Sequence, residues 1–214
     1  YVKVGYPNKW KDLSKLTIDP KKSYYENVQN CKKFWAEDAI KEKAGKPVDK
    51  DQWLMTPQTV NAYYNPTTNE ICFPAGILQY PFFDPKADDA FNYGAIGVVI
   101  GHEMTHGFDD QGRHYDKDGN MTDWWTAEDG KNFEARTGKY ADFFSAIKVL
   151  PDLYANGKLT LGENLADHGG LEVAFNAFMK TPEAKAGKTI MGFTPEQRFF
   201  IAYAGVWANN ITEA

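Results

Sequence analysis

The feature that most constrains the fold is a pair of histidines, His102 and His106, with Glu103 directly after the first. An apolar run, residues 95–100, leads into this H-E-x-x-H pattern, so the polar residues do not continue an amphipathic surface. On an α-helix, residues four apart lie one turn apart on the same face. Burying two histidines and a glutamate without partners would cost several kcal/mol. The fold must therefore give this helix face something to bind.

Two imidazoles spaced in this way can bind one zinc ion, at about 2.0–2.1 Å each. Glu103 lies beside the pair, where a carboxylate can act as general base toward a water in an open coordination position. By chance the pattern would occur in roughly a few per thousand chains of this length. We therefore predict half of a catalytic metal site on this helix, with coincidence on an ordinary helix as the weaker alternative.

A catalytic zinc site needs a third protein ligand. The extended pattern H-E-x-x-H-x-x-G-x-x-H would require glycine at position 109 and histidine at position 112, but the chain has Asp109 and Gly112 there. The remaining candidates are His114, His168 and a downstream carboxylate. For the two histidines, a solvated loop and a packing role, respectively, are the simpler interpretations.

Two downstream carboxylates, Glu163 and Asp167, are again four residues apart and so share one face of a helix. One of them can bind the metal while the other accepts the free N–H of a histidine ligand, which fixes the tautomer of the ring. An ordinary helix start, with acidic residues near its positive end, explains the same spacing equally well.

The composition excludes several classes of protein. Hydrophobic residues make up 43% and aromatic residues 15%, which is too much for a disordered chain. A net charge of −5 without a basic stripe argues against nucleic acid as a partner. No apolar run is long enough to span a bilayer, so we expect no membrane contact by this chain. With neither an initiator methionine nor a signal peptide, we interpret it as an internal piece of a longer protein. Cys31 and Cys72 are expected to be free thiols.

The patterning predicts an α+β fold that is mostly helical, with a small sheet. Capping boxes mark the starts of helices over 23–43 and from Thr194 onward, and Thr126 with Asp129 three residues later marks the start of a helix over 126–147. Further helices are expected over 88–107 and 159–179, and a β-hairpin over 59–74. The spacing of Gly94, Gly97 and Gly101 predicts close packing on one helix face, which would offset their helix-weakening effect.

The polar loop 109–123 contains an Asp-x-Asp-Gly-Asn run, residues 116–120, that raises the alternative of a calcium site. An EF-hand needs glycine at loop position 6 and glutamate at position 12. Here Gly119 falls at position 4 and Ala127 at position 12, so we expect an Asp-Gly turn instead.

Four separated stretches in a fixed order make the chain resemble the neprilysin and endothelin-converting-enzyme family of zinc endopeptidases. They are VNAYY at 60–64, FPAGIL at 73–78, GHEMTHGFDD at 101–110 and GENLAD at 162–167. The resemblance covers the whole chain, and its few cysteines resemble the bacterial oligopeptidase O branch. It implies a thermolysin-like zincin catalytic lobe. Residues 1–214 would be one catalytic domain, with a helical segment, 1–50, packing on a zinc-site core, 51–214.

The resemblance also implies roles for individual residues. His102, His106 and Glu163 would bind one Zn²⁺, Glu103 would be the catalytic base, and Asp167 would orient His102. Asp109 would be a further carboxylate behind a ligand. Asn61 and Ala62 would bind the substrate backbone, and an apolar pocket would receive the residue after the scissile bond. The residues expected to line that pocket are Ile77, Phe82, Val98, Val99, Val206 and Trp207, although a plain core role fits their apolar character too.

The family also carries an oxyanion-stabilising histidine and a substrate-binding arginine beyond the last helix, and the sequence ends before either. We therefore expect peptide substrates, and partners in an N-terminal lobe and a C-terminal segment of the same protein. The isolated chain should hydrolyse peptides poorly. An extracytoplasmic location is implied by the family, with a cytoplasmic one open for bacterial members. The alternative function is a zinc-stabilised, non-catalytic binding or structural domain.

Overall fold

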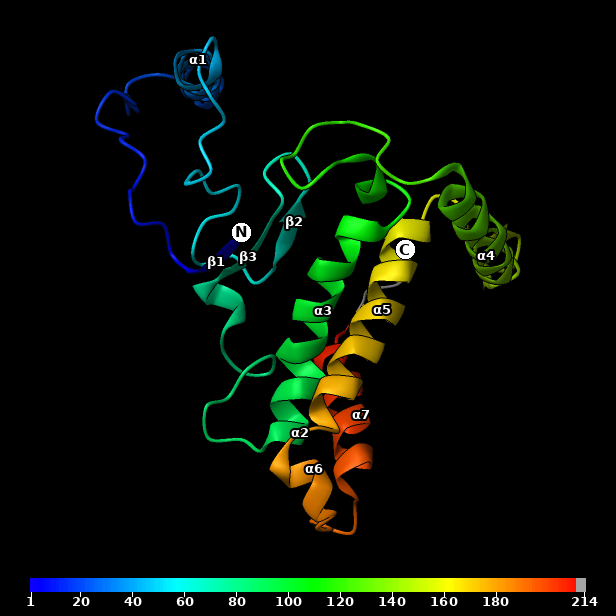
Figure 1. Cartoon of the computed structure of the whole chain (residues 1–214). Coiled ribbons are helices and arrows are strands. Elements are labelled where there is room, and N and C mark those ends of the chain that lie inside the picture. Colours follow the sequence, from blue (N-terminus) through cyan, green and yellow to red (C-terminus); the bar gives the residue numbers. More distant parts are fainter. Residues whose placement is uncertain (211–214) are drawn as a thin grey trace. The chain divides into compact units, whose positions relative to one another are not determined.

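The structure is a computed structural model that describes residues 1–210 (Figure 1). It divides into two compact units. The first contains Tyr1–Tyr6 and the chain from Met55 onward, and the second contains Pro7–Leu54. The first unit carries every residue for which the sequence predicts a role in catalysis or binding. The packing of residues 1–50 on the core stays a prediction.

The second unit contains one long helix, α1 (Tyr24–Lys43). The predicted capping box is present: the Ser23 hydroxyl accepts from the backbone N–H of Glu26, and the Glu26 carboxylate accepts from the backbone N–H of Ser23. Lys41 and Lys43 lie in the last turn, where positive charge is favourable against the helix dipole. The helix has no fully buried residue.

A three-stranded sheet opens the first unit. Its order is β1 (Val2–Gly5), β3 (Glu70–Pro74), β2 (Tyr63–Asn65), with β1 parallel and β2 antiparallel to β3. The predicted hairpin is confirmed, although its first strand begins only at Tyr63. Strand β1 was not predicted, and an ion pair between the buried side chains of Lys3 and Glu70, 2.8 Å apart, joins it to β3.

The predicted helix over 88–107 is confirmed as a nearly continuous rod. It consists of α2 (Asp89–Asn92), a π-helical segment (Tyr93–Gly97) and α3 (Val98–Thr105), followed by a 3₁₀ turn (His106–Phe108). The Asp88 side chain caps its start by accepting from the backbone N–H of Phe91. The wider π turn changes which residues face the rest of the fold, a local feature that glycine spacing alone does not predict.

The remaining elements follow in sequence order. They are α4 (Ala127–Ser145), the hairpin β4 (Lys148–Leu150) and β5 (Leu153–Tyr154), α5 (Leu161–Phe178), α6 (Pro182–Ala186) and α7 (Pro195–Val206). The predicted capping box of Thr194 with Gln197 is present, and the predicted helix start at Thr126 forms a capping box with Asp129. The short elements β4, β5 and α6 were not predicted.

Helices α3 and α5 run antiparallel, side by side, through the first unit (Figure 1). The start of α3 and the last turns of α5 contribute to a core cluster together with α7. The buried members of this cluster include Val98, Ala174, Phe178 and Phe199. A second cluster lies under the sheet and contains Ala62, Phe73, Ile77 and Ile96. Within residues 1–210 no helix combines the length and apolar character needed to cross a membrane. The predicted α+β class, mostly helical with a small sheet, is confirmed.

Candidate metal centre

Glycines bring the backbones of α3 and α5 into close contact near the two histidines. A Cβ on Gly170 would stand 2.5 Å from the backbone nitrogen of His102, and one on Gly101 would stand 2.7 Å from the carbonyl oxygen of Gly170. Neither position therefore has room for a larger side chain. Gly94 is similarly close to α7, where its Cβ would lie 2.2 Å from the carbonyl oxygen of Phe199, whereas Gly97 faces only its own helix.

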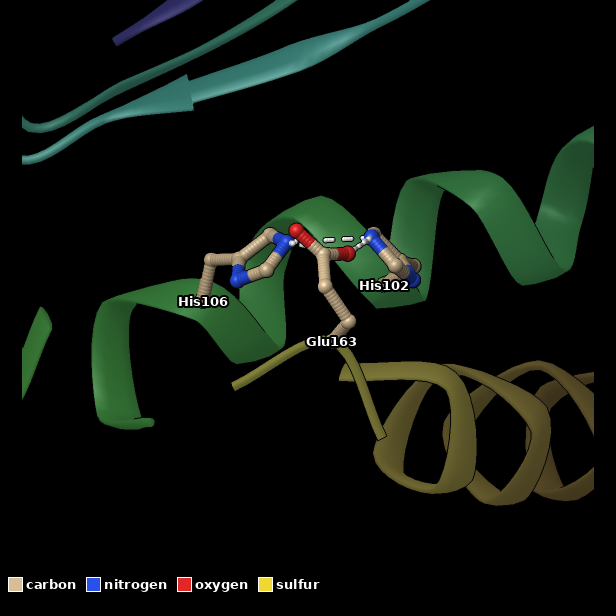
Figure 2. A group of neighbouring side chains, drawn as sticks. All are labelled: His102, His106 and Glu163. Atoms are coloured by element: carbon tan, nitrogen blue, oxygen red, sulfur yellow. Dashed lines mark hydrogen bonds and ion pairs between the residues drawn. The ribbon is translucent and has the colours of Figure 1, made fainter. Parts of the chain in front are cut away.

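The close approach places Glu163, in the first turn of α5, over His102 in α3 and His106 in the 3₁₀ turn that follows it (Figure 2). The two imidazole Nε2 atoms lie 3.0 Å apart, and Oε2 of Glu163 lies 3.4 Å from that of His102 and 3.6 Å from that of His106. Figure 2 shows the glutamate reaching across from the neighbouring helix to both rings. Among the described residues this is the one group of three metal-binding side chains close enough to share an ion.

The other nitrogen of each imidazole faces an aspartate. Nδ1 of His102 lies 2.9 Å from Oδ1 of Asp167, and Nδ1 of His106 lies 2.7 Å from Oδ2 of Asp109. A carboxylate accepts only, so each Nδ1 carries the proton and each Nε2 presents a lone pair. The structure thus pairs Asp167 with His102, as the resemblance implies, and gives Asp109 the partner that sequence reasoning left open.

The donor set fits a zinc ion. Two nitrogen lone pairs and a carboxylate oxygen converge without a proton between them, which is unfavourable unless a cation lies at their centre. Tetrahedral ligands at about 2.0–2.1 Å from one ion stand about 3.3–3.4 Å apart. The separations of 3.0–3.6 Å are close to that value. Nitrogen and carboxylate ligands in a set of three are those of catalytic zinc sites.

Glu103 is buried on α3 beside the pair of histidines, with 6% of its surface exposed. Burial raises the pKa of its carboxyl above the usual value of a glutamate, against a smaller opposing influence of the two neighbouring imidazoles. A backbone hydrogen bond from Tyr64 further favours the ionised form. The group is therefore suited to both accepting and returning a proton.

His106 and Asp109 shift each other's titration. Burial disfavours the imidazolium, but the hydrogen bond to Asp109 and the surrounding negative charges outweigh it and raise the pKa of His106. For Asp109, burial is likewise outweighed, because its carboxylate accepts from His106 and from the backbone N–H groups of Gly112 and Gln111, which together lower its pKa. Asp109 is therefore a fixed acceptor behind the ring.

A cleft of about 390 Å³ opens over these groups. One wall is the segment leading into the edge strand β2, with Asn61 and Ala62, and the other is the loop after α3. Sequence reasoning missed the wall residues Tyr63, Tyr64, Pro66, Gln111 and Gly112. Their proximity to Asn61 and Asp109 in the sequence was the available signal for them.

The six residues predicted to line an apolar pocket do not form one group. Ile77, Phe82 and Val99 pack in the cluster under the sheet, together with Ala62. The structure places Val98 in the other cluster, between α3 and α5. At the end of α7, Val206 is partly exposed and Trp207 is 58% exposed. None of the six lines the cleft itself.

The other polar residues singled out in the sequence lie outside the donor group. His168 packs edge-on against the ring of Tyr140, with ring centroids 5.8 Å apart. His114 ends a short 3₁₀ turn. The Asp116 carboxylate accepts from the backbone N–H groups of Asp118 and Asn120, and Gly119 has φ +85°, which is the hydrogen-bonded Asp-Gly turn predicted for this loop.

A family model described as peptidase family M13 matches residues 61–214 of the chain. The chain belongs to peptidase family M13. The match includes both helices of the candidate metal centre and the cleft wall formed by Asn61 and Ala62.

Curated relatives of this M13 chain include an endothelin-converting enzyme homolog from Locusta migratoria and neprilysin-3 from Drosophila melanogaster, each 43% identical to it. The matches cover 98% and 95% of the chain but only 30% and 26% of the respective relatives. The M13 chain therefore spans about a third or less of the length of the proteins it matches.

Solved structures similar to the chain also match it over nearly its whole length but over only about a third of their own. A Mycobacterium tuberculosis zinc metalloprotease in complex with an inhibitor is 48% identical, with a TM-score of 0.88, over 96% of the M13 chain and 32% of that structure. PepO from Lactobacillus rhamnosis is 36% identical, with a TM-score of 0.81, over 97% and 31%. The fold of the M13 chain is thus that of a part of a zinc metalloprotease.

Proposed function

We propose that this chain is the zinc-bearing part of a metalloendopeptidase that hydrolyses internal bonds of oligopeptides. The observation that supports this most directly is the convergence of His102, His106 and Glu163 beside the buried carboxylate of Glu103. A structural zinc site usually has four protein ligands and no use for a base beside them. Among the described residues, the cluster offers three side chains that could hold a metal, with the buried carboxylate of Glu103 beside them.

A bound zinc ion would supply Lewis acidity and lower the pKa of a water toward neutrality. The carboxylate of Glu103 takes a proton from the attacking water and returns it to the leaving amine, so no covalent intermediate with the protein is needed. Asp167 and Asp109 hold the rings of His102 and His106 in one tautomer and orientation.

The substrates proposed are oligopeptides cleaved on the amino side of hydrophobic residues. Asn61 and Ala62 line the cleft beside an edge strand, and an extended peptide can add to such an edge through main-chain hydrogen bonds. Ala62 also belongs to the apolar cluster with Ile77, Phe82 and Val99. An apolar substrate side chain would enter next to that cluster, with Val206 and Trp207 as further proposed contacts.

The relatives are about three times as long as this chain, so the complete activity is proposed for a longer polypeptide. An N-terminal lobe and a C-terminal segment would supply the groups that the resemblance implies, among them an oxyanion donor. Loss of one such donor typically lowers kcat about 10²–10³-fold. We therefore expect the isolated 214-residue polypeptide to bind zinc but to hydrolyse peptides slowly.

The decisive experiment compares the unchanged polypeptide with Glu103→Gln and His106→Ala. Zinc content is measured after gel filtration, and residual cleavage of an internally quenched peptide is measured at high protein concentration. We expect Glu103→Gln to keep stoichiometric zinc and lose about 10²-fold or more of the residual rate, as removal of a general base predicts. His106→Ala should lose the zinc.

Three results would contradict the proposal. One is an unchanged polypeptide that binds no zinc. Another is a residual rate that Glu103→Gln leaves intact, as expected for a non-catalytic zinc-stabilised domain. The third is an X-ray absorption spectrum with a fourth protein ligand on the zinc, because this would leave no position for the water.

A further inference from the structure

Asp110 is a partly buried carboxylate that the proposed mechanism does not use. Its Oδ2 accepts from the side-chain amide of its neighbour Gln111, at 2.9 Å. Its Oδ1 is buried and has no hydrogen-bond partner within the described part of the chain. An unpartnered buried carboxylate oxygen is costly unless positive potential faces it.

The buried oxygen faces the amino end of α5. The position of a Cβ on Gly162 lies 3.0 Å from Oδ1 of Asp110 and 3.1 Å from Oδ2 of Asp109. Gly162 is the second residue of the helix and directly precedes Glu163. The absence of a side chain at this position is what allows both carboxylates to come so near the helix.

Helix α5 has no side-chain cap of its own. Thr160 occupies the cap position, but its hydroxyl donates to the carbonyl of Asn156 and accepts from the side chain of Asn164. The first backbone N–H groups of an 18-residue helix therefore lack the usual acceptor, and the helix dipole makes this end positive. An anion beside it is stabilised.

The two neighbouring aspartates, Asp109 and Asp110, differ in the hydrogen bonds that they accept. Asp109 already accepts from His106 and from two backbone N–H groups. Oδ1 of Asp110 has no such partner among the described residues, and it lies where the loop after His106 comes close to the first turn of α5, which carries Glu163. We infer that Asp110 is a positioning residue, which holds the amino end of α5 so that Glu163 reaches the two imidazoles. This inference rests on the proposed zinc function of those three residues.

The test measures zinc affinity of the 214-residue polypeptide by chelator competition and records the visible spectrum of the Co²⁺-substituted form. Asp110→Asn keeps the shape of the side chain and removes its charge. We expect it to weaken zinc binding about tenfold or more, in the range found for residues behind metal ligands, and to alter the Co²⁺ spectrum. The unfolding temperature of the metal-free protein is measured in parallel.

Asp129→Asn is the matched control, because it removes a carboxylate from the first turn of α4, away from the donor group. It should lower stability slightly and leave the zinc affinity within about twofold, since only a helix-end charge is lost. Gly162→Ala tests the same contact from the other side, because its methyl would press on both carboxylates without removing a charge. It should weaken zinc binding several-fold without a matching loss of metal-free stability.

The measurements distinguish a failure of the proposed function from a failure of this inference. If the unchanged polypeptide bound no zinc, the proposed function and this inference would both fail. If it bound zinc and Asp110→Asn bound it equally well with the same Co²⁺ spectrum, this inference alone would be overturned. It would also be overturned if Asp129→Asn weakened the binding as much as Asp110→Asn does.

Discussion

At the scale of single residues, the two aspartates behind the histidines differ in their surroundings. The side chain of Asp109 is 7% exposed and accepts three hydrogen bonds, whereas that of Asp167 is 42% exposed and accepts one. Removing an acceptor from buried donors costs about 1–3 kcal/mol, while a solvated contact is replaced by water at little cost. Substitution of either aspartate should therefore weaken zinc binding to a similar degree, but the two substitutions should differ in their effect on the unfolding free energy.

Both Asp109→Ala and Asp167→Ala are expected to weaken zinc binding about 10–100-fold, because each releases the imidazole of one proposed ligand from its hydrogen bond. The metal-free protein should lose about 2–3 kcal/mol of unfolding free energy with Asp109→Ala and less than about 1 kcal/mol with Asp167→Ala. Chelator competition and urea unfolding of the metal-free variants give the two quantities. Equal losses of stability would show that burial of Asp109 has no energetic consequence.

Local signals made the helices predictable, and longer-range contacts explain the misses. A capping box lies within four residues, so those of Ser23, Thr126 and Thr194 could be read from the chain. Strand β1 could not, because its buried lysine is acceptable only opposite Glu70, 67 residues away. Sequence patterns describe which side chains are apolar, but not which distant partner makes a charge tolerable.

For the candidate site, too, the features set by local spacing could be predicted, and those set by tertiary contacts could not. The spacing of His102 and His106 indicated two donors on one helix face, but for Glu163 spacing alone left a ligand and a plain helix start equally open. What brings Glu163 within 3.6 Å of both rings is the glycine contact between two helices, which is tertiary. The resemblance assigns Val98 to the apolar pocket, but its side chain lies in the core cluster instead. Which face of the helix it occupies depends on the local winding of the helix, which the resemblance does not give.

At the scale of elements, the contact between α3 and α5 sets the distance between the two histidines and the third donor. Gly170 and Glu163 are seven residues apart and so lie on one face of α5. A methyl group on Gly170 would overlap the backbone of His102 and must push the helices apart. Two glycines elsewhere, Gly138 in α4 and Gly205 in α7, have open space where a Cβ would stand.

Gly170→Ala should therefore destabilise the protein by about 1–3 kcal/mol, as overpacking does, and should weaken zinc binding as well. Gly138→Ala is the matched control, because it makes the same change in an open helical position. It should gain about 0.5–1 kcal/mol, a rise in Tm of about 1–4 °C, with unchanged zinc affinity. Thermal unfolding and zinc titration of both variants decide the matter. A Gly170→Ala variant that behaved like the control would refute the role of this contact.

Across the whole molecule, the side chain of Arg198 connects the first turns of three helices, α2, α6 and α7. The guanidinium of Arg198, which is 12% exposed, binds Asp88 at the start of α2 and Glu183 in α6, and donates to the backbone carbonyls of Lys188 and Phe193. The planar fork of arginine suits several acceptors at once, which a lysine cannot match. This network lies at the opposite end of the long helix from His102.

Arg198→Ala is expected to lower the unfolding free energy by about 2–3 kcal/mol, somewhat below the value for a fully buried pair because Asp88 is partly exposed. Arg198→Lys should lose about half as much, since it retains the charge without the fork. Urea unfolding measures both, and zinc affinity should stay at the level of the unchanged protein. A loss of zinc affinity in Arg198→Ala would mean that the network also acts on the metal centre.

The position of strand β1 in the chain has a consequence for limited proteolysis. Tyr1–Tyr6 belongs to the first unit, yet the next residues of that unit begin at Met55. A single protease cut within Pro7–Leu54 would thus leave the amino-terminal peptide attached to the core by its pairing with β3 and by the Lys3–Glu70 ion pair. Both helices that carry the proposed ligands would remain on one uncut polypeptide, so the nicked protein should keep all three proposed zinc donors as a complex of two chains.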